Sequence, residues 1–133
     1  MKLATFLMAV LALMTLTACR ESDADLQADA CTELNQLQAS IAALTALGPT
    51  STVEQYEDAT KEVRESAQDA ARAVRRVEDE RAEELRDAEK DLDEAVDDVD
   101  DDEPVAAALA QIQPQIAAVV AARDQMTASL NCR

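Results

Sequence analysis

Hydrophobic residues recur at alternating spacings of three and four along most of the chain, which is the pattern of amphipathic helices packed side by side. One such stretch covers residues 34–44, and a second covers 53–77. The second pattern then shifts phase and continues over 85–99, and a third stretch covers 109–130 with Arg123 at one seam position. Since no segment alternates in the way of a half-buried strand, the pattern predicts an all-α fold.

A few residues that typically end or begin helices set the expected helix boundaries. Gly48 and Pro49 are typical of a helix end. Ser51 and Glu54 have the spacing of a capping box, which begins a helix, and Pro104 suits the first position of the last one. We therefore predict helices near residues 23–47, 51–100 and 103–131.

The second predicted helix is twice as long as its neighbours, about 75 Å at 1.5 Å per residue. The expected architecture is an elongated, antiparallel, coiled-coil-like bundle of three helices, in which two short helices cover successive halves of the long central one. The alternative breaks the central helix near Arg75–Arg81 and gives a compact bundle.

The N-terminus has the organisation of an export signal. Met1-Lys2 supplies a positive charge, and residues 3–16 are uncharged but too few to span a membrane. The segment Leu16-Thr17-Ala18-Cys19 resembles the lipobox of bacterial lipoproteins, although an ordinary secretory cleavage site also has small residues here. The resemblance implies that residues 1–18 are a lipoprotein signal peptide.

The same resemblance implies that Cys19 becomes the first mature residue and carries a diacylglycerol and an N-acyl lipid, with chains such as palmitate. No other cofactor is expected. Among Gram-negative lipoproteins Asp after the Cys usually signals retention in the inner membrane, so Arg20 favours the periplasmic face of the outer membrane if the cell has one. The predicted organisation is then a lipid-anchored tether over 19–30 that merges into the first helix, followed by an acidic domain over 31–133.

The three cysteines are explained if lipid occupies Cys19. Cys31 and Cys132 remain as an even pair in an oxidising compartment, which predicts a disulfide, with free thiols as the alternative. In the elongated architecture both cysteines lie level with the middle of the central helix. The bridge is therefore expected there, where it would tie the two short helices together.

The strong negative charge restricts the classes of molecule that the protein can bind. The formal net charge is −16, and residues 78–103 hold sixteen acids against three bases. No basic stripe exists to neutralise phosphates, which excludes nucleic acid as a partner.

The acidic segment contains two sets of candidate site residues. The candidates for binding a basic protein or peptide are Glu78, Glu80, Glu83, Glu84 and Asp87. Those for a divalent cation are Asp97, Asp98, Asp100, Asp101, Asp102 and Glu103, which lack the Gly and ligand spacing of an EF-hand. Both groups are also typical of a solvated charge run.

Residues 104–122 carry no charge but are rich in Ala and hold three Gln. This composition favours a buried bundle helix over a membrane span, and its surplus Ala-Val surface could support self-association. The chain superficially resembles the helical murein lipoproteins. Asn131-Cys132-Arg133 stands where those proteins have a terminal Lys, so covalent attachment to peptidoglycan is not implied.

Nothing in the sequence predicts an enzyme. There is no His, no Ser placed beside a base and no Gly-rich phosphate loop. The sequence predicts a small envelope lipoprotein with a structural or protein-binding role at the membrane surface. One alternative is an inhibitor or immunity protein that captures a basic toxin, lysozyme or cationic peptide through residues 78–103. Another is low-affinity binding of divalent cations.

Overall fold

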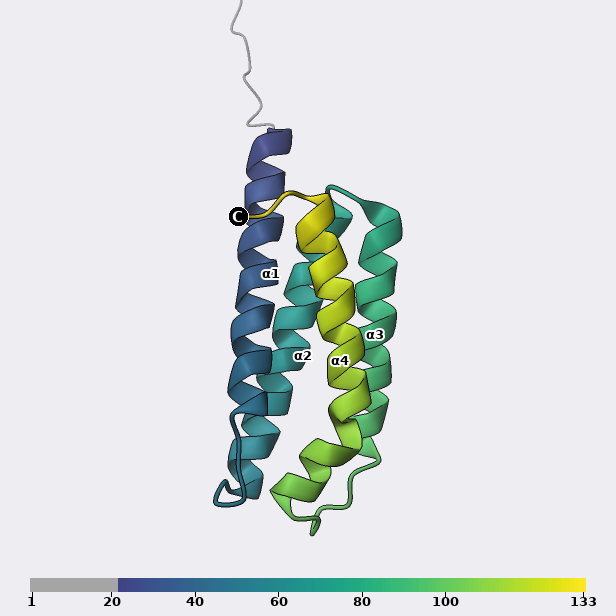
Figure 1. Cartoon of the computed structure of the whole chain (residues 1–133). Helices are drawn as coiled ribbons and strands as arrows, with labels where there is room; N and C mark the ends of the chain where they lie inside the picture. The colour runs from purple at the N-terminus through teal and green to yellow at the C-terminus, as the bar shows by residue number, and fades with distance from the viewer. Residues whose placement is uncertain (1–21) are drawn as a thin grey trace, which may run out of the picture.

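Four α-helices run antiparallel to their neighbours in the computed structural model, which describes residues 22–133 (Figure 1). Within this part of the chain there is no strand, so the predicted all-α class is confirmed. The predicted lipobox and export signal lie outside the described residues. The helices are α1 (Asp23–Thr45), α2 (Val53–Arg75), α3 (Asp79–Asp97) and α4 (Val105–Ser129).

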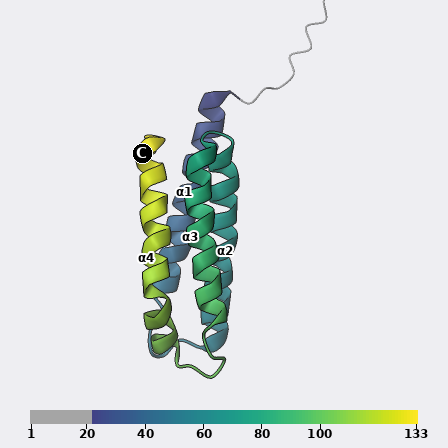
Figure 2. The same ribbon diagram turned by 90° about the vertical axis from the view of Figure 1, so that its right-hand side faces the viewer.

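The continuous helix predicted over residues 51–100 is wrong, and the alternative break near Arg75–Arg81 is the one observed. The chain leaves the helix after Arg75, and Glu78 has an extended backbone with φ −148° and ψ 96°. Helix α3 then folds back beside α2 (Figure 2). The molecule is consequently a four-helix bundle about half as long as the predicted one.

The break between α2 and α3 occurs where the regular spacing of buried apolar residues is interrupted. The last buried residue of α2 is Val74, and the next buried position in the chain is Ala82. A straight helix would carry Arg81 into the seam between helices, whereas the turn leaves its side chain 41% exposed. Folding back also buries Leu85 and Leu92 in the shared core, at 0% and 6% exposure. Each Å² of apolar surface removed from water in this way stabilises the compact form by about 25 cal/mol.

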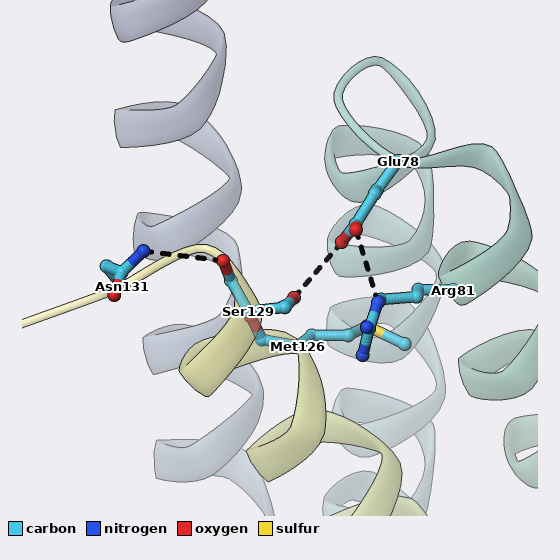
Figure 3. Close-up of polar contacts among 5 residues, drawn as sticks. All are labelled: Glu78, Arg81, Met126, Ser129 and Asn131. Atoms are coloured by element: carbon cyan, nitrogen blue, oxygen red, sulfur yellow. Dashed lines mark hydrogen bonds and ion pairs between the residues drawn. The ribbon is translucent and has the colours of Figure 1, made fainter.

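The turn between α2 and α3 is bound to the end of α4 through Glu78 (Figure 3). One carboxylate oxygen of Glu78 accepts a hydrogen bond from Ser129 Oγ at 3.0 Å, and the other accepts one from Arg81 Nε at 3.2 Å. The Ser129 carbonyl in turn accepts from Asn131 Nδ2 at 3.5 Å. Glu78 thus fixes the turn between α2 and α3 through its side-chain contacts, although neither Gly nor Pro lies beside it.

The core is built from aliphatic side chains of all four helices. Ser40 and Ser66 add a buried polar contact between α1 and α2, with their hydroxyl oxygens 2.9 Å apart. Tyr56 is the one aromatic side chain among residues 22–133. The largest fully buried side chains are Leu34, Leu37, Leu44, Val63, Val74, Leu85, Ile112, Val119 and Met126.

The capping box of α2 lies one residue later than predicted. Thr52 Oγ1 accepts from the Gln55 backbone N–H at 3.2 Å, and Gln55 Oε1 accepts from the Thr52 N–H at 2.9 Å. Ser51 instead accepts a hydrogen bond from the Gly48 N–H at 3.0 Å, which tightens the turn after α1. Both pairs satisfy the spacing rule for a capping box, and only the turn geometry selects between them.

Helix α1 begins eight residues before the predicted domain boundary at residue 31. Ser22 caps it, and Ser22 Oγ donates to Asp25 Oδ2 at 2.6 Å, which lowers the pKa of that carboxyl. Of the predicted tether over 19–30, residues 23–30 are therefore helical. Only residues 19–22 of the predicted tether precede the helix.

The predicted disulfide is present and joins Cys31 to Cys132, with 5.4 Å between their Cα atoms. It links the third turn of α1 to the tail that follows α4, close to the C-terminus (Figure 1). Its expected place at the middle of a long helix is wrong. Because the chain turns back at residues 76–78, that midpoint has become one end of the bundle.

Arg123 holds α4 against α1 about one helical turn beyond Cys31. Its side chain is 13% exposed, with Nε donating to the Leu34 carbonyl at 3.2 Å and a terminal N–H donating to Asn35 Oδ1 at 3.3 Å.

We expect Arg123→Ala to lower the free energy of unfolding by about 1–2 kcal/mol in a urea titration, because both contacts and the packing of the stem are lost. Arg123→Lys should recover only part of this, since Lys lacks the planar fork. An unchanged midpoint for Arg123→Ala would contradict the assignment.

Candidate functional site

Four of the five predicted partner-binding acids form an open surface on α3. Glu80, Glu83, Glu84 and Asp87 are all exposed, and no hydrogen bond or ion pair within residues 22–133 engages their side chains. Glu80 and Glu84, like Glu83 and Asp87, are four residues apart, a spacing at which like charges repel. We call these four residues the α3 acidic surface.

Glu78, the fifth predicted acid, has a different role. Its two carboxylate oxygens accept hydrogen bonds from Ser129 and Arg81, as Figure 3 shows. The side chain therefore stabilises the turn, and both of its carboxylate oxygens are already engaged within the bundle. Sequence spacing alone does not separate Glu78 from its neighbours, because Ser129 lies 51 residues further along the chain.

The charge of the molecule is concentrated on one side. Residues 78–103 have a net charge of −13 out of −16 for the whole chain, and 104–122 have none. Along α3 the acids are only partly compensated, for example by Lys90, whose Nζ lies 3.6 Å from Glu94. The two residues of that exposed pair are four positions apart on the helix, and the pair contributes at most a few tenths of a kcal/mol. A basic molecule would therefore meet the strongest field at α3 and the loop that follows it.

The acids predicted to bind a divalent cation lie at the end of α3 and in the loop before α4. Asp97 closes α3, and the Glu103 backbone N–H donates to the Asp100 carbonyl at 2.9 Å, which shapes the loop. Within residues 22–133 no three carboxylates come together in a way that could hold a metal ion. The loop lies at the opposite end of the bundle from the start of α1 (Figure 1).

A cleft of about 340 Å³ opens at this same end of the bundle. It is bounded by the first residues of α2 and α4 and by the last residues of α3 with the following loop. One part of its wall is apolar and is made by Val53, Val96, Val99, Val105 and Ala108.

The rest of the cleft is charged and predominantly acidic. Two bases, Lys61 and Arg64, lie on the α2 side. Both are engaged by acids outside the cleft, Lys61 by Glu65 at 3.9 Å and Arg64 by Asp93 of α3. The five acids that line the cleft are Glu57, Asp97, Asp100, Asp101 and Glu103.

Tyr56 is also among the residues that line the cleft. Its side chain is 6% exposed, and its hydroxyl is buried without a hydrogen-bond partner among residues 22–133. A buried hydroxyl without a partner costs about 1–3 kcal/mol. Burial also raises the pKa of Tyr56, so the phenol stays neutral at physiological pH and can both donate and accept.

The apolar spacing over residues 53–77 predicts only a packing role for Tyr56 and gives no sign of the cleft. The signal that could have singled it out is compositional, since it is the one Tyr in a chain without Trp. An aliphatic residue would fill a seam position without leaving a hydroxyl to satisfy.

Helix α4 is long and apolar enough to cross a membrane by length and composition, with a mean hydropathy of 1.5 over its best window. A core helix meets the same criteria. In the bundle one side of α4 is buried at Ile112, Ile116, Val119 and Met126, as expected for residues 104–122. Its opposite side is exposed and rich in Ala.

Comparison with known proteins gives no match: the chain resembles no protein-family model, no curated protein and no solved structure.

Proposed function

We propose that the protein is a lipid-anchored, non-catalytic protein of the cell envelope that binds a basic protein or peptide through the α3 acidic surface. The observation that carries the proposal is the set of exposed acids at Glu80, Glu83, Glu84 and Asp87, which have no partner within residues 22–133. Fixed acids four residues apart repel one another, and a cationic partner relieves this repulsion. Capture of a basic toxin, lysozyme or cationic peptide is the form of this activity that the charge favours.

The proposed anchor also fits the acidic surface. An anionic membrane repels a chain of net charge −16, so lipid on Cys19 has to supply the attachment. With α1 beginning at Asp23, the bundle stays close to the lipid. A helix of 23 residues is about 35 Å long, which sets the distance from the anchored end to the acidic loop. The acids are then presented on the side of the bundle and at its far end.

The test is binding of lysozyme, a basic protein, to the mature lipoprotein in uncharged detergent. We expect the triple variant Glu80→Gln/Glu84→Gln/Asp87→Asn to bind lysozyme about tenfold more weakly than wild type at low salt, because the steering field is reduced. Wild-type association should slow as salt rises. Surface plasmon resonance at two salt concentrations measures both effects.

A matched control removes the same number of charges from α2. Glu54, Asp58 and Glu62 are exposed acids outside α3, so Glu54→Gln/Asp58→Asn/Glu62→Gln should leave most of the affinity intact. Equal weakening by both triples would show that net charge, and not the α3 acidic surface, drives association. Lack of any salt-sensitive binding would overturn the proposal and leave a structural role.

A further inference from the structure

We propose that the cleft between α2, α3 and α4 binds a cationic nitrogen carried on an aliphatic stem, the chemistry of a Lys or Arg side chain. The inference deepens the proposed function, on which it rests, because it names the part of a basic partner that enters the protein. It assigns the α3 acidic surface to attraction and the cleft to specific recognition.

The unpartnered hydroxyl of Tyr56 is the first reason. Buried hydroxyls almost always have a hydrogen-bond partner, and this one has none among the described residues, although Tyr56 is one of the residues that line an open cleft. An ammonium or guanidinium N–H would supply the missing donor.

The two kinds of wall are the second reason. Val53, Val99 and Val105 offer contacts to methylene groups, while Asp100 and Asp101 are placed on the loop to neutralise a positive charge. Long basic side chains bury an apolar stem and keep the charged end near polar groups. The cleft offers both environments in one cavity, with apolar side chains for the stem and carboxylates for the charged end.

Charge and size exclude the simplest competitors. Five acids against two bases disfavour an anion, and both bases are already engaged by Glu65 and Asp93. A bare metal ion would need converging carboxylates, and residues 22–133 contain no such group of three. A volume of about 340 Å³ lies at the lower end of the range for small-ligand pockets and accommodates one side chain.

Tyr56 provides its own assay, since the chain holds one Tyr and no Trp. Its fluorescence in the mature lipoprotein should change saturably when Nα-acetyl-lysine methylamide is added. Nα-acetyl-norleucine methylamide has the same kind of aliphatic stem without the charge and should bind at least tenfold more weakly. An equal response to both probes would show an apolar pocket, and no response to either would show no side-chain site; each outcome overturns the inference.

Variants identify the groups involved. Tyr56→Phe should weaken binding of the lysine amide about tenfold in a calorimetric titration, while the midpoint of thermal unfolding stays the same or rises. Asp100→Asn/Asp101→Asn should weaken it similarly, whereas the control Asp58→Asn/Glu62→Gln, which replaces two exposed acids of α2 outside the cleft, should have little effect. A Tyr56→Phe protein that binds the amide normally would overturn the role of the hydroxyl.

The two proposals fail in different ways. Loss of lysozyme binding in the α3 triple variant, with no binding of the lysine amide to wild type, would overturn the cleft inference and support the acidic surface. Binding of the amide with no salt-sensitive binding of lysozyme would support the cleft chemistry and overturn the proposed function.

Discussion

Replacing both Cys31 and Cys132 by Ser should lower the free energy of unfolding by about 4 kcal/mol. The bridge closes a loop with a sequence separation of 101 residues. On the chain-entropy model, cross-linking a loop of this size removes about 4–5 kcal/mol of freedom from the unfolded chain. A small domain has only about 5–15 kcal/mol of stability in total, so this change is a large fraction of it.

The core gives a second reason to expect a large effect. Many of its buried residues are Ala or Val, including Ala67, Ala70, Val63 and Val74, and small side chains remove little surface from water. Domains of this kind depend more on a covalent staple than those with aromatic cores. The bundle is therefore poorly placed to compensate for loss of the bridge.

Urea unfolding followed by circular dichroism measures the effect. Wild type treated with a reductant should unfold at the same urea concentration as the double Ser variant, and the reductant should not affect the variant itself. A double Ser variant with the wild-type midpoint would mean that the disulfide contributes nothing, and the loop-closure argument would be wrong.

On the proposed lipid anchor, replacing Cys19 by Ser should abolish lipid attachment when the protein is expressed in a bacterial host. Because each buried methylene contributes about 0.8 kcal/mol, two or three acyl chains make an effectively permanent anchor, and no other membrane attachment is expected for so acidic a protein. The variant should incorporate no labelled palmitate and should change its electrophoretic mobility. Metabolic labelling followed by membrane fractionation measures both.

The disulfide variant is the matched control for this experiment. Cys31→Ser/Cys132→Ser removes two cysteines and should still incorporate palmitate, which separates lipidation from thiol chemistry elsewhere in the chain. A Cys19→Ser protein that stays in the membrane with unchanged mobility would show that the lipobox resemblance is misleading. The α3 acidic surface would then have to act without this anchor.

Local patterns along the chain were sufficient for the class of fold. The spacing of apolar residues predicted helices over most of residues 23–131, and assigning Cys19 to lipid left Cys31 and Cys132 as the predicted pair, which the structure joins. The exposed acids Glu80, Glu83, Glu84 and Asp87 were also identifiable, because a run of charges at helical spacing is a property of adjacent residues.

The break between α2 and α3 was not decided by the sequence alone. Neither Gly nor Pro marks residues 76–78, so the local preference for helix continues through them. What ends the helix is the area buried when Leu85 and Leu92 fold back, together with the contact between Glu78 and Ser129 of α4. Both are interactions between distant parts of the chain, and a local pattern does not contain them.

The cleft likewise depends on contacts between distant parts of the chain. Tyr56, Asp100 and Val105 come from three separate segments, and only the reversal at residues 76–78 brings the end of α3 to the start of α2. The sequence by itself determined the helices, the pairing of cysteines and the placement of charge, since each depends on neighbours or on simple counting. Tertiary structure decided which helices meet, where the disulfide lies and which hydroxyl remains without a partner, because these depend on burial summed over the whole bundle.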